Sequence, residues 1–390
     1  MTEYVFPNDA HVTWSVMIVL YPYITGLVAG AFVVSSLYHL FGKEQLRTVA
    51  RFSLASAFVF LIFAPLPLLV HLGHPDRALN ILITPNFTSA MAGFGLIYLA
   101  YLLLVALELW FVMRHDLIER AKGRGLIAWG CRAVLFFDLR ESEATRAADK
   151  KVVKVLAGLG IPMACLLHGY VGFLFGSLKA NPWWDTPLMF VIFIFSAIVS
   201  GIAVLIFHYL LVSRINRWTI DEGCVRGLGR YLWGFMMVAV ALELLELLSI
   251  AYKQTEETAV LGRLISDQLF WTYTVAQFLV FSLIPFFLLA TVAVFEVNTS
   301  WLYRLTWIAA TMLLIQVLLM RWNVVIGGQL LSKSMRGFTS YFPDIWHREG
   351  VIVAVVIFTM PFLLLWVLHR IVPLFPKALA SSKPDVAAGA

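Results

Sequence analysis

Four short segments of the sequence place histidine, asparagine, tyrosine or arginine beside long apolar runs. They are Asn8-Asp9-Ala10-His11, the segment from His71 through His74 and Arg77 to Asn80, His168-Gly169-Tyr170, and Arg321-Trp322-Asn323. These side chains can hydrogen-bond a carbonyl ligand, and histidine also exchanges protons near neutral pH. Each has a plainer reading alone, such as Asn8 as a helix cap or Arg321 as a side chain that snorkels to head groups. Their convergence on one predicted membrane face favours a ligand site.

Three acidic residues fall inside long apolar runs, namely Glu108, Glu243 and Glu246. Glu243 and Glu246 are three residues apart and are therefore expected on one side of a helix. A carboxyl group in hydrocarbon is either protonated or paired, which is the property that a proton relay uses. A proton path through these residues and His168 is one interpretation, and a helix-packing hydrogen bond to a neighbour such as His168 is the other.

The composition indicates the class of protein in which these groups must be positioned. The chain has 390 residues, of which 61% are hydrophobic and 13% charged, with a mean hydropathy of +0.85. These values exclude soluble, disordered, collagen-like and coiled-coil classes and indicate a membrane protein. The three cysteines, Cys131, Cys165 and Cys224, have no spacing that could build a disulfide framework or an iron–sulfur cluster from this chain alone. Any such cluster must come from a partner.

A membrane helix needs roughly 20 apolar residues, and nine runs meet that length. The sequence therefore predicts an all-α polytopic membrane protein with about nine spans and one membrane domain over residues 1–375. The predicted spans are 14–41, 52–71, 90–113, 153–178, 187–212, 231–251, 270–295, 302–320 and 351–369. Residues 114–152 are expected to form a cytoplasmic loop with an interfacial helix at 126–137, and 376–390 a disordered tail.

Lysine and arginine residues favour the cytoplasmic side of a membrane, and their distribution predicts the orientation. With the amino terminus outside, 21 of the 29 lie in inner segments and 8 in outer ones. We therefore expect a periplasmic amino terminus and a cytoplasmic carboxyl terminus in the cytoplasmic membrane. The net charge of +6 then reflects topology and does not indicate a nucleic-acid partner. The last outer loop is the exception, because four basic residues, including Arg321 and Arg348, fall there.

Haem is a second cofactor to consider, because multi-span proteins with histidine are often cytochromes. Bis-histidine haem needs two imidazoles that face each other across a bundle. The histidines within or near spans are His39, His168, His208 and His369. One haem between His39 and His208 is geometrically possible, but no span holds two histidines spaced for two stacked haems. We expect neither haem nor an iron–sulfur cluster in this chain.

Several motifs resemble the NrfD/PsrC family of polysulfide-reductase membrane subunits, mostly in the first half of the chain. HLGHPDRALN (71–80) is similar to the family's D-L-G-R-P-E-R-F hallmark, and TPNFTSAMAGF (84–94) to its Ser-rich start of the next span. GYVGFLFGSLKANPWW (169–184) resembles its Y-T-G-V-L-L stretch, and Asn8-x-x-His11 the opening of its first helix. RWNVVIGGQLLSKSMRGF (321–338) is similar to a subset that includes the DsrP subunits of sulfite-reduction-associated complexes.

The resemblance implies a menaquinone site near the periplasmic face, with a ferredoxin-like [4Fe-4S] subunit of a respiratory complex docked above it. The positions that match the family's quinone contacts are Asn8, His11 and Tyr170. His71 and His74 stand where the hallmark has Asp and Arg, so a role carried from those residues is not assigned to them. Nine spans also exceed the eight of the simplest members.

The hypothesis from the sequence is a menaquinone head group between the outer ends of the first, second and fourth spans. Its carbonyls would be hydrogen-bonded by His11 and Tyr170. The wider set of candidate quinone-binding residues is Asn8, His11, His71, His74, Arg77, Tyr170, Arg321 and Asn323. Trp183, Trp184, Arg321 and the loop 333–348 are the expected docking surface for the partner. The alternatives are a haem b cytochrome, a secondary transporter with broken helices, and a structural anchor.

Overall fold

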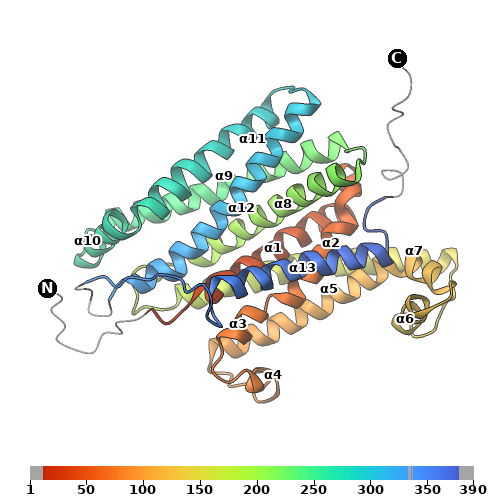
Figure 1. Ribbon diagram of the computed structural model, residues 1–390, viewed down its shortest axis with the longest axis horizontal. Coiled ribbons are helices and arrows are strands. Elements are labelled where there is room, and N and C mark those ends of the chain that lie inside the picture. Colours follow the sequence, from red (N-terminus) through yellow and green to blue (C-terminus); the bar gives the residue numbers. More distant parts are fainter. Residues whose placement is uncertain (1–11, 333–334, 336, 377–390) are drawn as a thin grey trace.

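Nine long helices form the molecule, as a computed structural model describes it for residues 12–332, 335 and 337–376. Within these residues, nine helices are long and apolar enough to cross a membrane, and they run side by side along the long axis of the molecule (Figure 1). They are α1 (Val16–His39), Glu44–His71 with α2 (Arg47–Phe63) and α3 (Leu66–His71), α5 (Ala90–Ala121), α7 (Glu143–Gly176), α8 (Met189–Asn216), α9 (Glu222–Lys253), Phe270–Val294, α12 (Thr299–Leu330) and α13 (Val351–Ile371). The predicted all-α polytopic fold is confirmed, while its orientation stays a prediction.

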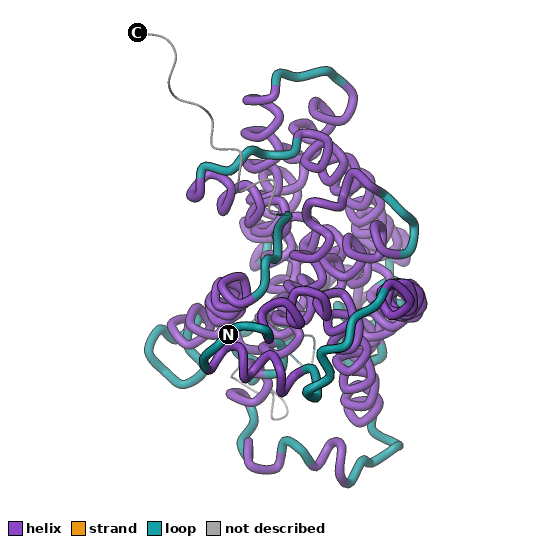
Figure 2. The backbone as a smooth tube through the Cα atoms, turned by 90° about the vertical axis from the view of Figure 1, so that its right-hand side faces the viewer, coloured by secondary structure: helices purple, strands orange, loops and turns teal. Residues whose placement is uncertain are grey.

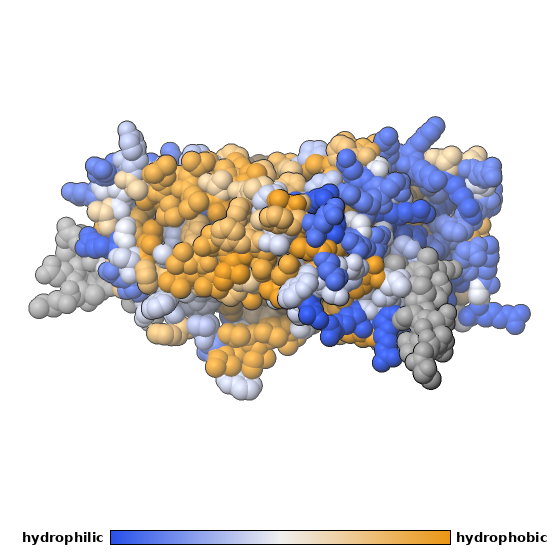
Figure 3. Space-filling model, turned by 90° about the horizontal axis from the view of Figure 1, so that it is seen from above, coloured by the Kyte–Doolittle hydropathy of each residue, from blue (hydrophilic) through white to orange (hydrophobic). Residues whose placement is uncertain are grey.

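The surface agrees with a membrane location. Figure 3 shows an apolar band around the middle of the bundle between hydrophilic ends. We name the end at which α1 begins and α12 finishes the predicted outer end, and the opposite end, at which α7 begins, the predicted inner end. Most short elements lie between the spans, namely η2 (Pro75–Arg77), α4 (Asn80–Ile83), α6 (Leu126–Val134), α10 (Glu256–Arg263) and η3 (Leu264–Gln268). A helix thus forms within 126–137, but its place at a membrane surface stays a prediction.

Helix α1 lies near the middle of the bundle in Figure 1, and Figure 2 views the bundle roughly along its helices. It packs against α2, α7, α8, α12 and α13, and its apolar segment is the most buried of the nine. The closest approach is to α8, because a Cβ atom on Gly30 would lie only 2.6 Å from the Cα atom of Gly201. Small residues four apart, Gly26 and Gly30, allow this contact, as small residues commonly do in membrane helix pairs.

The seventh span is irregular. Phe270–Leu283 (η4) is π-helical, and α11 (Ile284–Val294) continues it as an α-helix. Pro285 is the second residue of α11, and because it has no N–H group it cannot donate a backbone hydrogen bond to the π-helical segment before it. π-Helical segments are rare and are often found at functional sites. Here the segment contains Gln277, a buried polar residue.

Several helices extend beyond their predicted apolar runs. α5 continues to Ala121, and α7 begins at Glu143, where Ser142 and Thr145 form a capping box. α12 continues ten residues past the predicted end at 320. The assignment of Arg321 and Asn323 to an outer loop is therefore wrong, because both lie inside α12. The Gly327-Gly328 pair does not end the helix, since the Trp184 ring packs on it: a Cβ atom on Gly328 would lie 2.3 Å from Trp184 Nε1.

Candidate functional site

A buried guanidinium group lies between α8 and α12. The Arg321 side chain is 0% exposed. Its Nη2 donates to Ser196 Oγ at 2.8 Å and to the Phe193 carbonyl at 3.4 Å, and its Cζ lies 3.8 Å from the centre of the Phe193 ring. Among the described residues it forms no ion pair. Arg321 is therefore neither a loop residue nor part of an exposed docking surface, as the sequence had suggested.

A chain of hydrogen bonds joins α12 to α9 beside this arginine. Asn323 Nδ2 donates to Gln277 Oε1 at 2.8 Å, and Gln277 Nε2 donates to Glu243 Oε2 at 2.8 Å. All three side chains are buried. Gln277 was not among the predicted site residues, because a single amide in an apolar run carries no distinctive spacing. Its presence means that Glu243 is held by Gln277 and not by His168, the partner suggested from the sequence.

A small cavity of about 30 Å³ adjoins this chain and is lined by Glu243, Glu246, Tyr273 and Gln277, among others. Glu243 Oε1, Glu246 Oε1 and Asn323 Oδ1 are buried and have no hydrogen-bond partner among the described residues. The cavity is large enough for a water molecule with several polar partners. The predicted pairing of Glu243 and Glu246 on one side of a helix is thus matched by their shared position at this cavity.

The remaining buried polar residues of the predicted proton path lie elsewhere. His168 on α7 is buried, and neither of its ring nitrogens has a partner in the described part of the chain. It faces α1, because a Cβ atom on Gly26 would lie 3.4 Å from its Nε2. Glu108 on α5 is also buried and unpartnered within the described residues. Since α5 packs mainly on α2, α6 and α7, Glu108 belongs to a different region from Glu243.

Tyr170 lies at the predicted outer ends of α5 and α7. Its hydroxyl donates to the Ala90 carbonyl at 2.8 Å. Gly93 makes room for it, since a Cβ atom there would lie 2.5 Å from the hydroxyl oxygen. His168 and Tyr170 are two positions apart and point roughly 200° apart around the helix axis, so the two side chains do not face one another. Asn8 and His11, the other predicted contacts, lie outside the described residues.

A second polar group joins three segments at the predicted outer end. Glu349 Oε2 lies 2.6 Å from His71 Nδ1 and accepts a hydrogen bond of 2.6 Å from Ser15 Oγ. Partial burial acts to raise the pKa of Glu349, but the hydrogen bonds from Ser15 and His71 outweigh it and leave that pKa below its ordinary value. His74 and Arg77 lie apart from this group, with side chains 72% and 69% exposed. Of these three residues, only His71 is therefore part of the Glu349 group.

The loop between α7 and α8 closes over α12. Trp183 Nε1 donates to the Asn323 carbonyl at 3.0 Å and Trp184 Nε1 to the Val324 carbonyl at 2.7 Å. Both rings are buried. The prediction that Trp183 and Trp184 form an exposed docking surface is therefore wrong. In the loop 333–348, Phe342 and Trp346 are 87% and 84% exposed and remain available to a partner.

The histidines considered for haem occupy packed or charged surroundings. The His208 ring packs between Phe52 and Phe362, with centroids 4.9 and 5.7 Å away. His39 lies beside Tyr38 and lines a charged cleft at the predicted inner end. His369 Nδ1 accepts from the Leu374 backbone N–H at 3.3 Å. The His208 imidazole is therefore packed between two aromatic rings.

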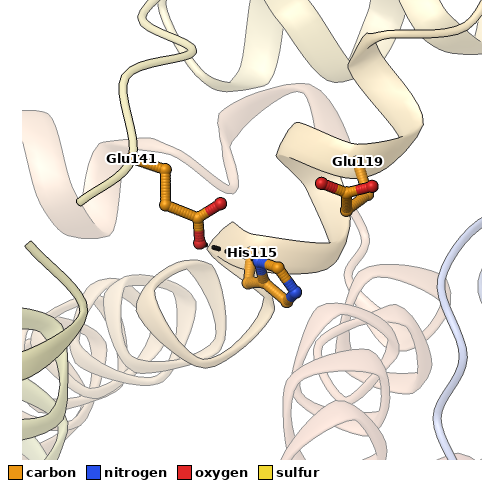
Figure 4. Close-up of side chains that lie close together, drawn as sticks. All are labelled: His115, Glu119 and Glu141. Carbon is orange, nitrogen blue, oxygen red and sulfur yellow. Dashed lines mark hydrogen bonds and ion pairs between the residues drawn. The ribbon is translucent and has the colours of Figure 1, made fainter. Parts of the chain in front are cut away.

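His115, Glu119 and Glu141 form a further cluster at the predicted inner end (Figure 4), which no pattern in the sequence indicated. Their potential ligand atoms lie within 4.8 Å of one another, a spacing that a metal ion would tolerate. Each carboxylate already pairs with a cation, however: Glu119 with Lys122 at 2.6 Å and Glu141 with Arg146 at 2.7 Å. The Arg146 hydrogen bond lowers the pKa of Glu141 to about 2 against the opposing effect of burial, and His115 adds to the lowering.

Comparison with known proteins gives a consistent group of similarities. Residues 6–332 match the family model described as "Polysulphide reductase, NrfD". The chain is 27% identical to the C subunit of the selenate reductase of Mesobacillus selenatarsenatis over 94% of its own length and 87% of that protein. It is 25% identical to the integral membrane subunit of an Hdr-like menaquinol oxidoreductase of Archaeoglobus fulgidus over 88% of this chain and 77% of that one. It is 26% identical to protein NrfD of Escherichia coli over 58% and 70% of the two chains.

Proposed function

Because this chain belongs to the NrfD polysulphide reductase family, we propose that it is the quinone-reacting membrane subunit of a respiratory oxidoreductase complex in the cytoplasmic membrane. In this proposal, electrons pass between the menaquinone pool and a [4Fe-4S] subunit docked at the predicted outer face. The relative from Archaeoglobus fulgidus, which is named as part of a menaquinol oxidoreductase, supports the choice of quinone. The direction of electron flow and the terminal substrate depend on partner subunits.

The observation that carries this proposal is the position of the Tyr170 hydroxyl. It lies at the predicted outer end of α7 and donates to a backbone carbonyl at the first residue of α5, and Gly93 leaves room for it. The segment before α5 presents two exposed apolar side chains, Ile83 and Phe87. A quinone that leaves the bilayer at this depth meets an apolar surface and then a hydroxyl that can exchange its carbonyl partner. This hydroxyl can donate to a quinone carbonyl.

Quinol oxidation also requires a proton acceptor and an exit for electrons. His11 would accept a proton, because histidine exchanges protons near neutral pH. His71 is an alternative with a defined position, because Glu349 holds its Nδ1 and leaves Nε2 for a ligand. The exposed aromatic rings of Phe342 and Trp346 lie in the same connection as Glu349 and can pack against the iron–sulfur subunit. Aromatic side chains of this kind are common at protein interfaces.

Binding of a quinol-analogue inhibitor to the purified chain tests the proposal. Quenching of tryptophan fluorescence should saturate for the wild type and should weaken in Tyr170→Phe and in His11→Ala. Tyr252→Phe is the matched control, because Tyr252 is 86% exposed and lies on a different helix. Absence of saturable binding to a folded sample, with the iron–sulfur partner present, would refute a quinone site and favour the anchor or transporter alternatives.

The cavity at Glu243 and Glu246 supports a second candidate function, the movement of protons coupled to quinone turnover. Two carboxyl groups share this cavity, and each has an oxygen without a partner in the described region. A water molecule there would connect them and so allow a proton to pass. In proteoliposomes, Glu243→Gln should abolish proton movement and leave inhibitor binding intact. Unchanged proton movement would contradict this role.

A further inference from the structure

A large charged cleft opens at the predicted inner end of the bundle. Its volume is about 760 Å³, and it lies between the end of α1, η1 (Glu44–Leu46) and the start of α2 on one side, and α5 and α7 on the other. Seven lysine and arginine side chains line it, against three acidic ones. The lining therefore has an excess of four positive charges before histidine is counted. Neither the family resemblance nor the proposed quinone site accounts for this cleft.

Ion pairs use only some of these cations. Arg140 pairs with Asp138 at 3.4 Å within their own loop. Arg51 pairs with Asp116, Arg114 with Asp149 at 3.1 Å, and Arg146 with Glu141 at 2.7 Å. These pairs hold α2, α5 and α7 together and form the walls of the cleft. Of the cluster in Figure 4, His115 and Glu141 line this cleft, and both carboxylates of the cluster are already paired with cations.

Three basic residues of the lining are left over. Arg47, Lys150 and Lys154 form no ion pair with any residue that the structure describes. Lys150 and Lys154 are four positions apart on α7 and so point to the same side of that helix. His39 also lines the cleft, and its Nε2 is buried without a partner in the described part of the chain. The cleft thus presents several unused hydrogen-bond donors to an anion.

The apolar surroundings of the cleft indicate the kind of anion. On α7, the exposed apolar residues Val155 and Leu159 lie one and five positions after Lys154. On α1, Phe41 is exposed just after the helix ends. Charged and apolar surfaces therefore meet at this level, and Figure 3 shows a boundary of this kind on one face of the molecule. A ligand at this depth can place a charge in the cleft and an alkyl chain along the helices.

We propose that this cleft binds the phosphodiester head group of an anionic phospholipid, with Arg47, Lys150 and Lys154 around the phosphate and the acyl chains along Val155 and Leu159. Basic pockets between membrane helices commonly bind such head groups, because several fixed cations and hydrogen-bond donors meet a delocalised anion. A soluble phosphate would use the same cations but would gain nothing from the neighbouring apolar surface. The bound lipid would hold α2 and α7 together at their charged ends.

Native mass spectrometry of the full-length chain in mild detergent tests the proposal. The probes are phosphatidylglycerol and phosphatidylcholine with identical acyl chains, and inorganic phosphate alone. The variant Lys150→Gln with Lys154→Gln removes two unpaired cations from the lining. The control Lys43→Gln with Lys151→Gln removes the same charge from exposed lysines nearby that do not line the cleft. Arg47→Gln is a third variant, which approaches the phosphate from the opposite wall.

The wild type should bind phosphatidylglycerol more tightly than phosphatidylcholine. Loss of two cations should weaken phosphatidylglycerol binding by roughly tenfold or more, whereas the control pair and phosphatidylcholine binding should change little. Arg47→Gln should produce a smaller loss in the same direction. Equal binding of both lipids, or an equal loss in the control pair, would overturn the proposal. Binding of inorganic phosphate as tightly as phosphatidylglycerol would also overturn it, because the cleft would then be a soluble-anion site.

Discussion

Substitution of Gly30 by alanine should separate the two central helices. A Cβ atom at this position would lie 2.6 Å from Gly201 Cα and 2.6 Å from the Ile198 carbonyl oxygen, and both belong to the backbone of α8. Carbon atoms in ordinary contact are about 3.5–4.0 Å apart, so α1 and α8 would have to move apart by roughly 1 Å. Backbone atoms cannot rotate away as a side chain would. Overpacking of this kind costs about 1–3 kcal/mol.

Gly234→Ala provides the matched control for this substitution. Gly234 lies inside α9, and a Cβ atom there would meet nothing within 4 Å. Both substitutions gain the same helix propensity, about 1 kcal/mol, so the difference between them isolates the clash. The assay is the free energy of unfolding during titration of a mild detergent with a denaturing one. Gly30→Ala should be less stable than Gly234→Ala by about 1–3 kcal/mol. Equal stability of the two variants would refute the close approach of α1 to α8.

Substitutions at four other positions test the polar contacts. Leucine at Asn323 and at Gln277, singly and together, should give a coupling energy of about 0.5–3 kcal/mol in a double-mutant cycle, whereas additive effects would contradict their hydrogen bond. Because the pKa of Glu349 is lowered in the folded chain, its contribution to stability is present above the unfolded pKa and is lost as the pH falls through the folded pKa. Glu349→Gln should therefore remove part of the acid-induced loss of stability below about pH 4.5, and an unchanged pH profile would argue against the contact with His71. Trp184→Phe should cost about 1 kcal/mol through the lost hydrogen bond to α12, and no change in unfolding free energy would contradict that contact.

The nine spans were predictable because apolar runs of membrane length are a strong signal, and the runs and the helices agree within the described residues. The residues at which the helices begin and end were less predictable. Ion pairs such as Arg114 with Asp149 stabilise charged turns of α5 and α7 that hydropathy alone assigns to a loop. Packing of Trp184 on Gly328 similarly keeps α12 helical through two glycines.

The site was only partly predictable, because the partners of polar residues are set by tertiary packing. Arg321 was selected from the sequence as a basic residue on the wrong side of the membrane. In the structure it is buried, and its guanidinium group donates a hydrogen bond to Ser196 on α8. Gln277 and Glu349 were not selected, since a neutral amide in an apolar run and an acid in a loop have no local pattern. Each became visible only through its partner, Glu243 or His71.

The most direct measurement for the proposed quinone site is photo-crosslinking of an azidoquinone to the protein in membranes, followed by peptide mapping. Labelling should occur in residues 83–94 and 168–176, which include Tyr170 and its neighbours Ala90 and Gly93, and it should be displaced by excess menaquinone. Tyr170→Phe should reduce this labelling, and Tyr252→Phe should leave it unchanged. Displaceable labelling confined to α9 and α12, with none near Tyr170, would contradict the proposed position of the quinone.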